Sequence, residues 1–318
     1  MLPYFEKDTE LWRRRFALRG FGQILPRDVS PLRFPGGKAS LKYFLADTVC
    51  ENSLQAKTLV EPFCGGCGAT LPLLMGKVVG KLRINDSNPA ISAFWHAVFF
   101  DADNFLQLLN DTPVDIETWL AFKADIRNPQ SLSDLELGFR AFYLNRTNRS
   151  GLIIGGPIGG RAQSGKYKIG CRFNKTDLIE RIEKLSRLNG QVEVFNKDAV
   201  QLLRYLGARR LQSSFVFLDP PYVRHGYNIY REFCFRESDH RRLADFLKEK
   251  KWRWLLTYDD CELIHSLYSE RKHGVLEYSY YMQTAKIGRE LILASSMCRI
   301  PRPEKDNGVQ LVADRRLG

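Results

Sequence analysis

Four consecutive residues, Asp219-Pro220-Pro221-Tyr222, join an acid, a rigid backbone turn and an aromatic ring. An apolar run precedes them and predicts a buried strand, which must stop pairing at two prolines that cannot donate hydrogen bonds. Asp219 can accept one hydrogen bond from an exocyclic amine, and the carbonyl of Pro220 can accept the other. Two such acceptors would direct the nitrogen lone pair toward an incoming methyl group while Tyr222 stacks on the ring. These residues predict a catalytic site for a flat, amino-bearing ring.

A second set of residues surrounds the glycine turn that follows another apolar run, residues 57–63. Gly65 and Gly66 allow backbone amides to approach a ligand closely. Asp86 stands 20 residues after Gly66, a spacing that suits ribose hydroxyls, although capping of the next helix is an alternative role.

The acid at the end of the first strand narrows the choice of ligand. Glu61 would repel a pyrophosphate, and the turn follows neither GxxxxGK[ST] nor GxGxxG. S-adenosylmethionine (SAM), which carries an ammonium, a sulfonium and a ribose, therefore fits Glu61 and Asp86 better than NAD does.

A parallel sheet would bring these side chains together. Apolar or β-branched runs predict strands at 57–63, 81–88, 191–196, 214–219 and 252–258, and two late strands near 275–281 and 290–295. Helical patterns follow several of them, at 89–100, 199–207 and 238–250, the last with Ser238 as its N-cap. This alternation predicts an α/β fold with a mostly parallel sheet and helices on both faces, and ligands bind at the carboxyl ends of such strands.

The alternation of strand and helix patterns is interrupted between residues 101 and 188. We expect a basic N-terminal extension at 1–30, a catalytic domain at 31–100 and 189–300, and a polar, loose tail at 301–318. Helical patterns in the interruption at 101–188 predict a helical, DNA-binding insertion. The seven glycines between Gly151 and Gly170 predict a mobile hairpin or long loop within it. Its predicted DNA contacts are polar and basic: Arg146, Asn148, Arg149, Arg161, Lys166 and Lys168.

Composition limits the class of protein. The 318 residues have a net charge of +12, which favours a polyanionic partner. The sequence has neither an apolar run of membrane-spanning length nor a secretory signal, so we expect a cytoplasmic protein. Cys64 and Cys67 form a lone pair without the further ligands that zinc needs, and the seven cysteines are scattered, so we expect neither a metal nor a disulfide framework.

Several motifs, taken in order, resemble those of the Dam-type D12 family of DNA adenine-N6 methyltransferases. They are "RFPGGK", "LVEPFCGGCGATL", "INDSNPAI", "FYLNRTNRSG", "DPPY", "LLTYDD" and "GRELILAS". The resemblance implies a Rossmann-like methyltransferase fold. It also implies that Asp219, Pro220 and Tyr222 are catalytic. The residues implied in SAM binding are Phe34, Gly36, Gly37, Lys38, Glu61, Phe63, Gly65, Gly66, Asp86, Asp198 and Asp219.

The resulting hypothesis is a SAM-dependent enzyme that methylates adenine in double-stranded DNA after flipping the base out of the helix. The hypothesis is compatible with a cognate restriction or defence partner, and it requires neither a membrane nor a metal. Three alternatives stay open at this point: a cytosine-N4 methyltransferase, an RNA or protein-glutamine methyltransferase, and a catalytically inactive DNA-binding paralogue.

Overall fold

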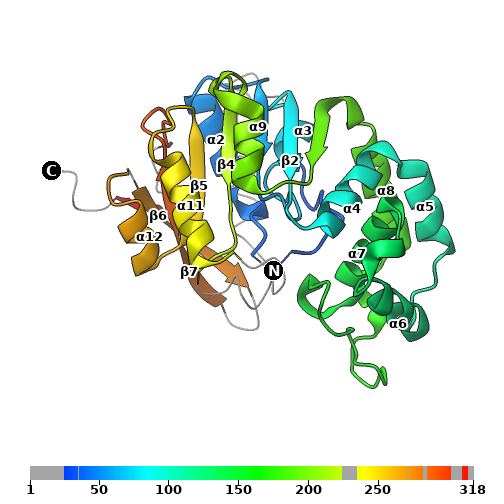
Figure 1. The fold of residues 1–318 in the computed structure, drawn as a ribbon. Helices are drawn as coiled ribbons and strands as arrows, with labels where there is room; N and C mark the ends of the chain where they lie inside the picture. Colours follow the sequence, from blue (N-terminus) through cyan, green and yellow to red (C-terminus); the bar gives the residue numbers. More distant parts are fainter. Residues whose placement is uncertain are drawn as a thin grey trace.

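The computed structural model describes residues 25–34, 36–223, 235–271, 273–281, 285–301 and 310–313. Within them, eight strands form one sheet in the order β3-β2-β1-β4-β5-β7-β6-β8 (Figure 1). The strands are β1 (Thr58–Glu61), β2 (Lys81–Asn85), β3 (Val192–Phe195), β4 (Ser214–Leu218), β5 (Trp254–Asp259), β6 (His273–Tyr281), β7 (Ala285–Ala294) and β8 (Gln310–Ala313).

Strands β1 to β5 pair in parallel, and β7, β6 and β8 extend the sheet with antiparallel pairs. The chain moves outward from β1 to β2 and β3, then returns to β4 on the other side of β1. The carboxyl ends of β1 and β4 therefore flank the point where the strand order reverses, which is where open α/β sheets bind ligands. The predicted mostly parallel α/β fold is confirmed.

Helices cover both faces of the sheet, because side chains alternate along its buried strands. Phe215 and Phe217 of β4 belong to one apolar core, which includes residues of α2 (Lys42–Glu51), α3 (Leu71–Met75) and α4 (Pro89–Phe100). Val216 and Leu218 belong to a second core with α9 (Ala199–Gln212), α11 (Glu237–Lys248) and α12 (Glu262–Leu267).

A helical lobe lies beside the parallel edge of the sheet, to the right in Figure 1. It contains α5 (Ala102–Asp111), α6 (Ile116–Asp125), α7 (Asp134–Thr147) and α8 (Lys175–Ser186). Its core is aromatic: the Phe94 ring of α4 stacks on Phe142 with centroids 5.7 Å apart and meets Phe105 edge-on at the same separation. Helix α4 thus connects the sheet to the lobe.

The loops between these elements contain short 3-10 helices. They lie at Ala39–Leu41, Pro129–Ser131, Arg149–Gly151, Ile169–Arg172 and Asn189–Gln191.

Several local predictions need correction. The glycine-rich segment forms turns with one isolated antiparallel bridge, Asn148 to Pro157, rather than a regular hairpin. Helix α11 is capped by Arg236 instead of Ser238, and Asn88 instead of Asp86 caps α4. The tail is not loose throughout, since β8 pairs with β6.

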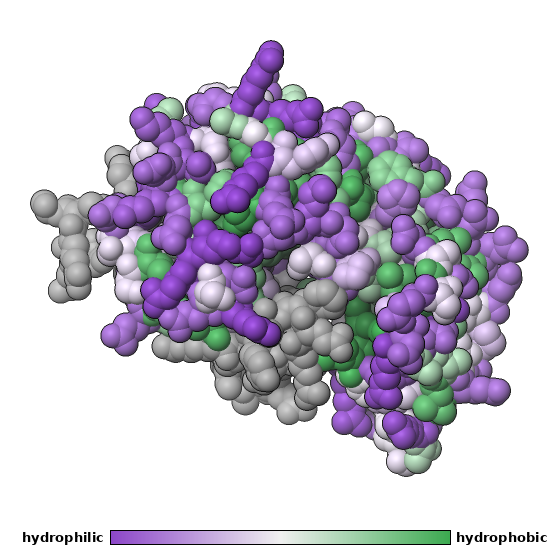
Figure 2. Space-filling model, in the orientation of Figure 1, coloured by the Kyte–Doolittle hydropathy of each residue, from purple (hydrophilic) through white to green (hydrophobic). Residues whose placement is uncertain are grey.

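Hydrophilic side chains cover most of one face of the molecule, and hydrophobic residues are scattered among them (Figure 2). Among the described residues, no helix is long and apolar enough to cross a membrane.

Candidate active site

A cavity of about 630 Å³ opens at the carboxyl ends of β1 and β4. Its walls come from the segment before α2, the glycine turn after β1, the residues after β2, the helical lobe, and the Asp219-Pro-Pro turn. Of the sequence-predicted site residues, it brings together Phe34, Gly36, Gly37, Lys38, Glu61, Phe63, Gly65, Gly66, Asp86, Asp219 and Arg146.

Lys38 lies at the centre of the charged part of this cavity. Its side chain is only 8% exposed, and its Nζ is 3.3 Å from Asp219 Oδ2 and 3.3 Å from Glu290 Oε1. It also donates a hydrogen bond to the Gly36 carbonyl at 2.9 Å and stands 4.7 Å from the centroid of the Tyr222 ring. Burial by itself would lower the pKa of Lys38, but the two carboxylates outweigh it and raise the pKa above its ordinary value.

Asp219 ends β4 and is held from two sides. Its Oδ2 faces Lys38, and its Oδ1 accepts a hydrogen bond of 2.6 Å from Thr257 Oγ1 on β5. Burial raises the pKa of Asp219 above its usual value; Lys38 opposes this effect, whereas Glu290 adds to it. The carboxylate is therefore oriented before any substrate arrives.

Sequence reasoning missed Glu290 and Thr257. Glu290 lies on β7 and is 3% exposed, and Thr257 is fully buried on β5. The available signal was an acid at the start of the apolar run 290–294, since a buried acid is usually paired. The identity of its partner depends on the antiparallel β5–β7 pairing, which lies outside any local pattern.

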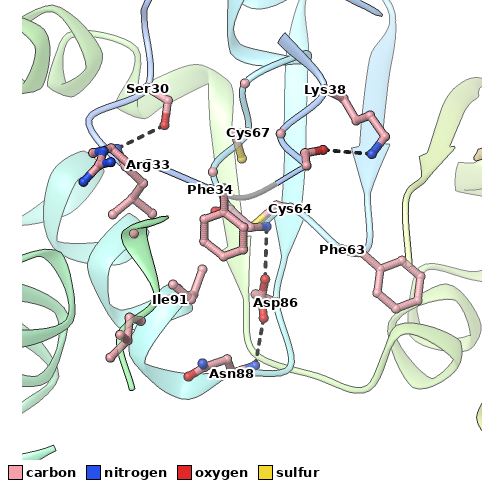
Figure 3. Close-up of a pocket in the computed structure, with 18 of the residues that line it drawn as sticks. Ser30, Arg33, Phe34, Lys38, Phe63, Cys64, Cys67, Asp86, Asn88 and Ile91 are labelled. Carbon is pink, nitrogen blue, oxygen red and sulfur yellow. Dashed lines mark hydrogen bonds between the residues drawn. The ribbon is translucent and has the colours of Figure 1, made fainter. Parts of the chain in front are cut away.

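The glycine turn and Asp86 form a compact cradle (Figure 3). Gly65 donates its N–H to Asp86 Oδ2 at 3.0 Å, and Asn88 donates its N–H to Oδ1 at 2.9 Å. A Cβ at Gly65 would lie 3.0 Å from the Phe34 ring, and Gly65 has a φ of +43°, so glycine is required there. Burial raises the pKa of Asp86 to about 6, although both N–H groups oppose the shift.

Glu61 is the most deeply buried acid of the cavity wall, at 4% exposure. It accepts a hydrogen bond from the Thr70 hydroxyl. Burial, with smaller contributions from the nearby Asp219 and Asp86, raises the pKa of Glu61 to about 8. Three carboxyl groups, Glu61, Asp86 and Asp219, thus converge on one part of the cavity, which favours a cationic ligand.

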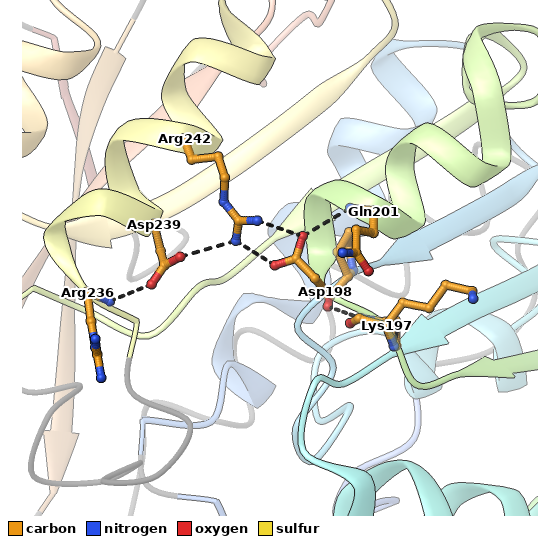
Figure 4. A network of polar contacts seen from close by, with 8 residues as sticks. Lys197, Asp198, Gln201, Arg236, Asp239 and Arg242 are labelled. Atoms are coloured by element: carbon orange, nitrogen blue, oxygen red, sulfur yellow. Dashed lines mark hydrogen bonds and ion pairs between the residues drawn. The ribbon is translucent and has the colours of Figure 1, made fainter.

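Asp198 does not line this cavity. It lines a neighbouring pocket of about 150 Å³ together with Phe63 and Phe235, which also border the main cavity. Asp198 caps α9, and its Oδ2 is 2.6 Å from Arg242 Nη2 (Figure 4).

The two remaining residues of the predicted catalytic set also lie outside the cavity wall. Pro220 is buried, and Tyr222 packs against the second core, with its ring 6.3 Å from that of Tyr258. Pro221 lines the cavity instead.

The six predicted DNA contacts lie in three different environments. Arg149, Arg161, Lys166 and Lys168 are exposed on or beside the glycine-rich segment, and Arg146 lines the cavity. Asn148 is fully buried. Its Oδ1 accepts from Trp119 Nε1 at 2.7 Å, and its Nδ2 donates to two carbonyls, Leu152 at 2.7 Å and Ile153 at 2.9 Å. This placement does not fit a direct contact with DNA and corrects that prediction.

Residues 224–234, including His225, lie outside the residues that the structure describes. Across the part of the chain that the structure describes, no group of three or more His, Cys, Asp or Glu residues is placed to hold a metal ion. The free thiols of Cys64 and Cys67 are buried, and burial raises the pKa of both, which fits packing rather than reactivity.

The strand order and the acid-lined cavity at its switch point define the Rossmann-like methyltransferase class of α/β proteins. The model of the D12 class N6 adenine-specific DNA methyltransferases matches residues 34–282, and the chain belongs to that family. The family identified from the sequence motifs is therefore confirmed.

Individual relatives are more distant. The chain is 24% identical over 238 residues to the Type II methyltransferase M.CviBI of Paramecium bursaria Chlorella virus NC1A, which covers 74% of this chain and 86% of the relative. A solved structure, the putative methyltransferase yhhF from Escherichia coli, aligns with a TM-score of 0.29 and 10% identity over 80% of this chain and 86% of that one.

Proposed function

We propose that the chain uses SAM as its methyl donor and holds it in the cavity beside Lys38. The observation that carries this proposal is the convergence of Glu61, Asp86 and Asp219 on one cavity beside a glycine turn. An ammonium, a sulfonium and ribose hydroxyls match these acceptors. When bound, SAM supplies an electrophilic methyl group.

Each wall of the cavity has a proposed role in binding this donor. Asp86, oriented by the N–H groups of Gly65 and Asn88, would accept from the ribose hydroxyls. Glu61 would face the cationic amino-acid end. The adjoining pocket between Phe63 and Phe235, with Asp198 held in place by Arg242, would take the aromatic base of the donor.

Asp219 is the proposed acceptor for the target amine. Its two oxygens already contact Lys38 and Thr257, and each keeps a further lone pair for an N6 hydrogen. The Pro220 carbonyl would accept the second hydrogen, and the fixed turn holds both acceptors in advance. Tyr222 would stack on the flipped adenine, and the extra proton of the methylated nitrogen would leave through Asp219.

We further propose that Arg149, Arg161, Lys166 and Lys168 contact the DNA backbone, since all four are exposed around the glycine-rich segment. The enzyme would act in the cytoplasm. One relative is called a Type II methyltransferase, so a cognate restriction partner is included in the proposal. Methylation-aware sequencing of DNA from a non-methylating host that expresses the chain would give the target sequence.

Replacement of Asp219 tests the mechanism. Methyl transfer from labelled SAM to duplex DNA should fall at least about 100-fold in Asp219→Asn and Asp219→Ala, because the oriented acceptor is lost. Glu193→Gln, an acid of the β2–β3 surface pair, serves as the control. Digestion of the wild-type product to nucleosides should yield N6-methyladenine. Normal transfer by Asp219→Ala would rule out the mechanism, and N4-methylcytosine would overturn the proposed target.

A further inference from the structure

The cavity has a second wall with the opposite charge. Five arginines line the cavity. One of them, Arg127, follows α6, and its charge acts on Lys123. The other four, Arg33, Arg146, Arg172 and Arg181, form the basic wall. They come from four separate segments, namely the loop before α2, the end of α7, the 3-10 helix at Ile169–Arg172, and α8. Arg33 and Lys38 lie on opposite sides of Phe34 (Figure 3), so the basic wall is distinct from the lysine–carboxylate centre.

The positive charge of this wall is poorly balanced. Arg181 pairs with Asp177 at 3.0 Å, whereas no described residue forms an ion pair with the other three arginines. Arg33 and Arg146 each donate at 3.3 Å to a backbone carbonyl, of Asn148 and Pro31 respectively. The Nε of Arg146 is buried and has no hydrogen-bond partner among the described residues.

The electrostatics reflect the same imbalance. Burial, with the charges of Arg33, Arg181 and Arg172, lowers the pKa of Arg146 to about 10, although Asp177 opposes the shift. Burial likewise lowers the pKa of Arg33, and Arg172 contributes to the shift. Asp28 also lines the cavity, and its charge acts on Lys42. An incoming anion would relieve the mutual repulsion of the guanidinium groups.

The chemistry of the wall selects the anion. Guanidinium groups present paired N–H donors that match the oxygens of a phosphate. The single carboxylate of SAM stands beside an ammonium, which four arginines would repel, and the acids on the other side of the cavity already fit that cationic end. A phosphodiester carries negative charge without a neighbouring cation, so it fits the basic wall better.

We infer that the wall formed by Arg33, Arg146, Arg172 and Arg181 binds a backbone phosphate of the DNA strand whose adenine enters the cavity. This inference rests on the proposed function, because it takes duplex DNA as the substrate. A phosphate held there would anchor the strand inside the cavity mouth, in addition to the outer contacts of the glycine-rich segment, and would favour the extruded base.

Arg172→Gln and Arg181→Gln test the inference. The Arg172 side chain is exposed and forms no hydrogen bond with the described residues, so its loss should not disturb folding. Arg209→Gln is the matched control, since Arg209 is exposed at the end of α9 that leads into β4, away from the carboxyl ends of the strands. Thermal melts of all variants should coincide with that of the wild type.

Binding to an unmethylated duplex that contains the target sequence should be measured as a function of salt concentration. SAM binding should be measured separately. For each cavity variant we expect roughly 3–10-fold weaker DNA binding at moderate salt and a salt slope shallower by roughly one, with unchanged SAM affinity. Arg209→Gln should behave as wild type. Neutral methylphosphonates at single positions near the target adenine should weaken wild-type binding at one position, where Arg172→Gln should be insensitive.

The other outcomes are equally decisive. Unchanged DNA affinity and slope, with normal wild-type methylation, would refute this inference alone. Weakened SAM binding with unchanged DNA binding would assign the arginines to the SAM carboxylate and overturn it. A wild-type protein that neither binds SAM nor methylates DNA would refute the proposed function itself.

Discussion

Lys38 places one ammonium between two carboxylates. Two carboxylates, Asp219 and Glu290, share its ammonium, and Glu290 is more deeply buried than Asp219. A buried ion group of this kind adds little net stability, but removal of one member leaves a charge uncompensated. We therefore expect Glu290 to be a positioning residue, which acts on the target amine through Lys38 and Asp219.

The pH dependence of Glu290→Gln tests that role. Because the charge of Glu290 raises the pKa of Asp219, the uncharged variant should ionise Asp219 at lower pH. The acid limb of kcat/KM against pH should move to lower pH than in the wild type. A loss of activity with the acid limb in place would instead indicate a purely structural role for Glu290.

Glu61 gives a second prediction at this scale, and it concerns stability. Its pKa of about 8 in the folded protein lies above the ordinary value of 4.5. The folded state therefore binds this proton more tightly than the unfolded state, and the contribution of Glu61 becomes increasingly destabilising from about pH 4.5 to pH 8. In the ligand-free protein, Glu61→Gln should raise the free energy of unfolding above pH 8 by as much as about 4 kcal/mol.

Urea unfolding at pH 5 and at pH 8.5 measures this difference. The two proteins should be nearly equal in stability at pH 5, and the variant should be the more stable one at pH 8.5. SAM binding should be weaker in the variant, because the acid that would face the cation is gone. Equal stability of the wild type and the variant at both pH values would contradict a raised pKa for the buried Glu61 carboxyl.

At the scale of elements, Asn148 connects the end of α7 to α6 and to the glycine-rich segment. Its buried side-chain amide accepts a hydrogen bond from Trp119 of α6 and donates hydrogen bonds to two loop carbonyls. Asn148→Ala would leave these groups unpaired and should cost about 3 kcal/mol of stability. The adjacent exposed Arg149→Ala should change stability by less than about 0.5 kcal/mol but weaken DNA binding.

Urea midpoints and DNA affinity of both variants check this prediction. An Asn148→Ala protein with wild-type stability and weakened DNA binding would restore Asn148 as a DNA contact. That outcome would also require the loop to open, since the side chain is fully buried in this structure.

Sequence patterns predict strands well where both faces of the strand are buried. The runs that become β1, β2 and β4 are apolar and short, and each is followed by turn residues, so their position is determined locally. β8 was missed because an edge strand of four residues depends on its partner β6. Helix α12 has six residues, too few for a periodic pattern.

The same distinction applies to the site. The turn and spacing of Gly65, Gly66 and Asp86 identify the cradle, because these residues interact across neighbouring parallel strands. The interior position of Asn148 and the ion pair of Asp198 with Arg242 depend on tertiary packing between distant helices, which residue type alone does not reveal.

At the scale of the whole molecule, the sheet and the helical lobe share one core. A single cluster of buried residues runs from Leu59 and Leu82 of the sheet through Phe94 of α4 to Phe142 of α7. The cavity lies where these parts meet, with Glu61, Asp86 and Asp219 on the sheet side and Arg146, Arg172 and Arg181 from the lobe. Such continuity predicts that the sheet and the lobe unfold together, so that both walls of the site form at the same time.

Phe142→Ala tests this cooperativity, because its ring lies wholly inside the lobe and stacks on Phe94. Removal of a buried phenyl group should cost about 3–5 kcal/mol. Unfolding in urea should be followed with Trp119 as the only tryptophan in one background and Trp254 as the only one in another, to report on lobe and sheet separately. Both probes should shift by the same amount and keep coincident transitions. If only the Trp119 transition moved, the lobe would be an independent folding unit, and the arginine wall could dissociate from the acidic wall without loss of the sheet.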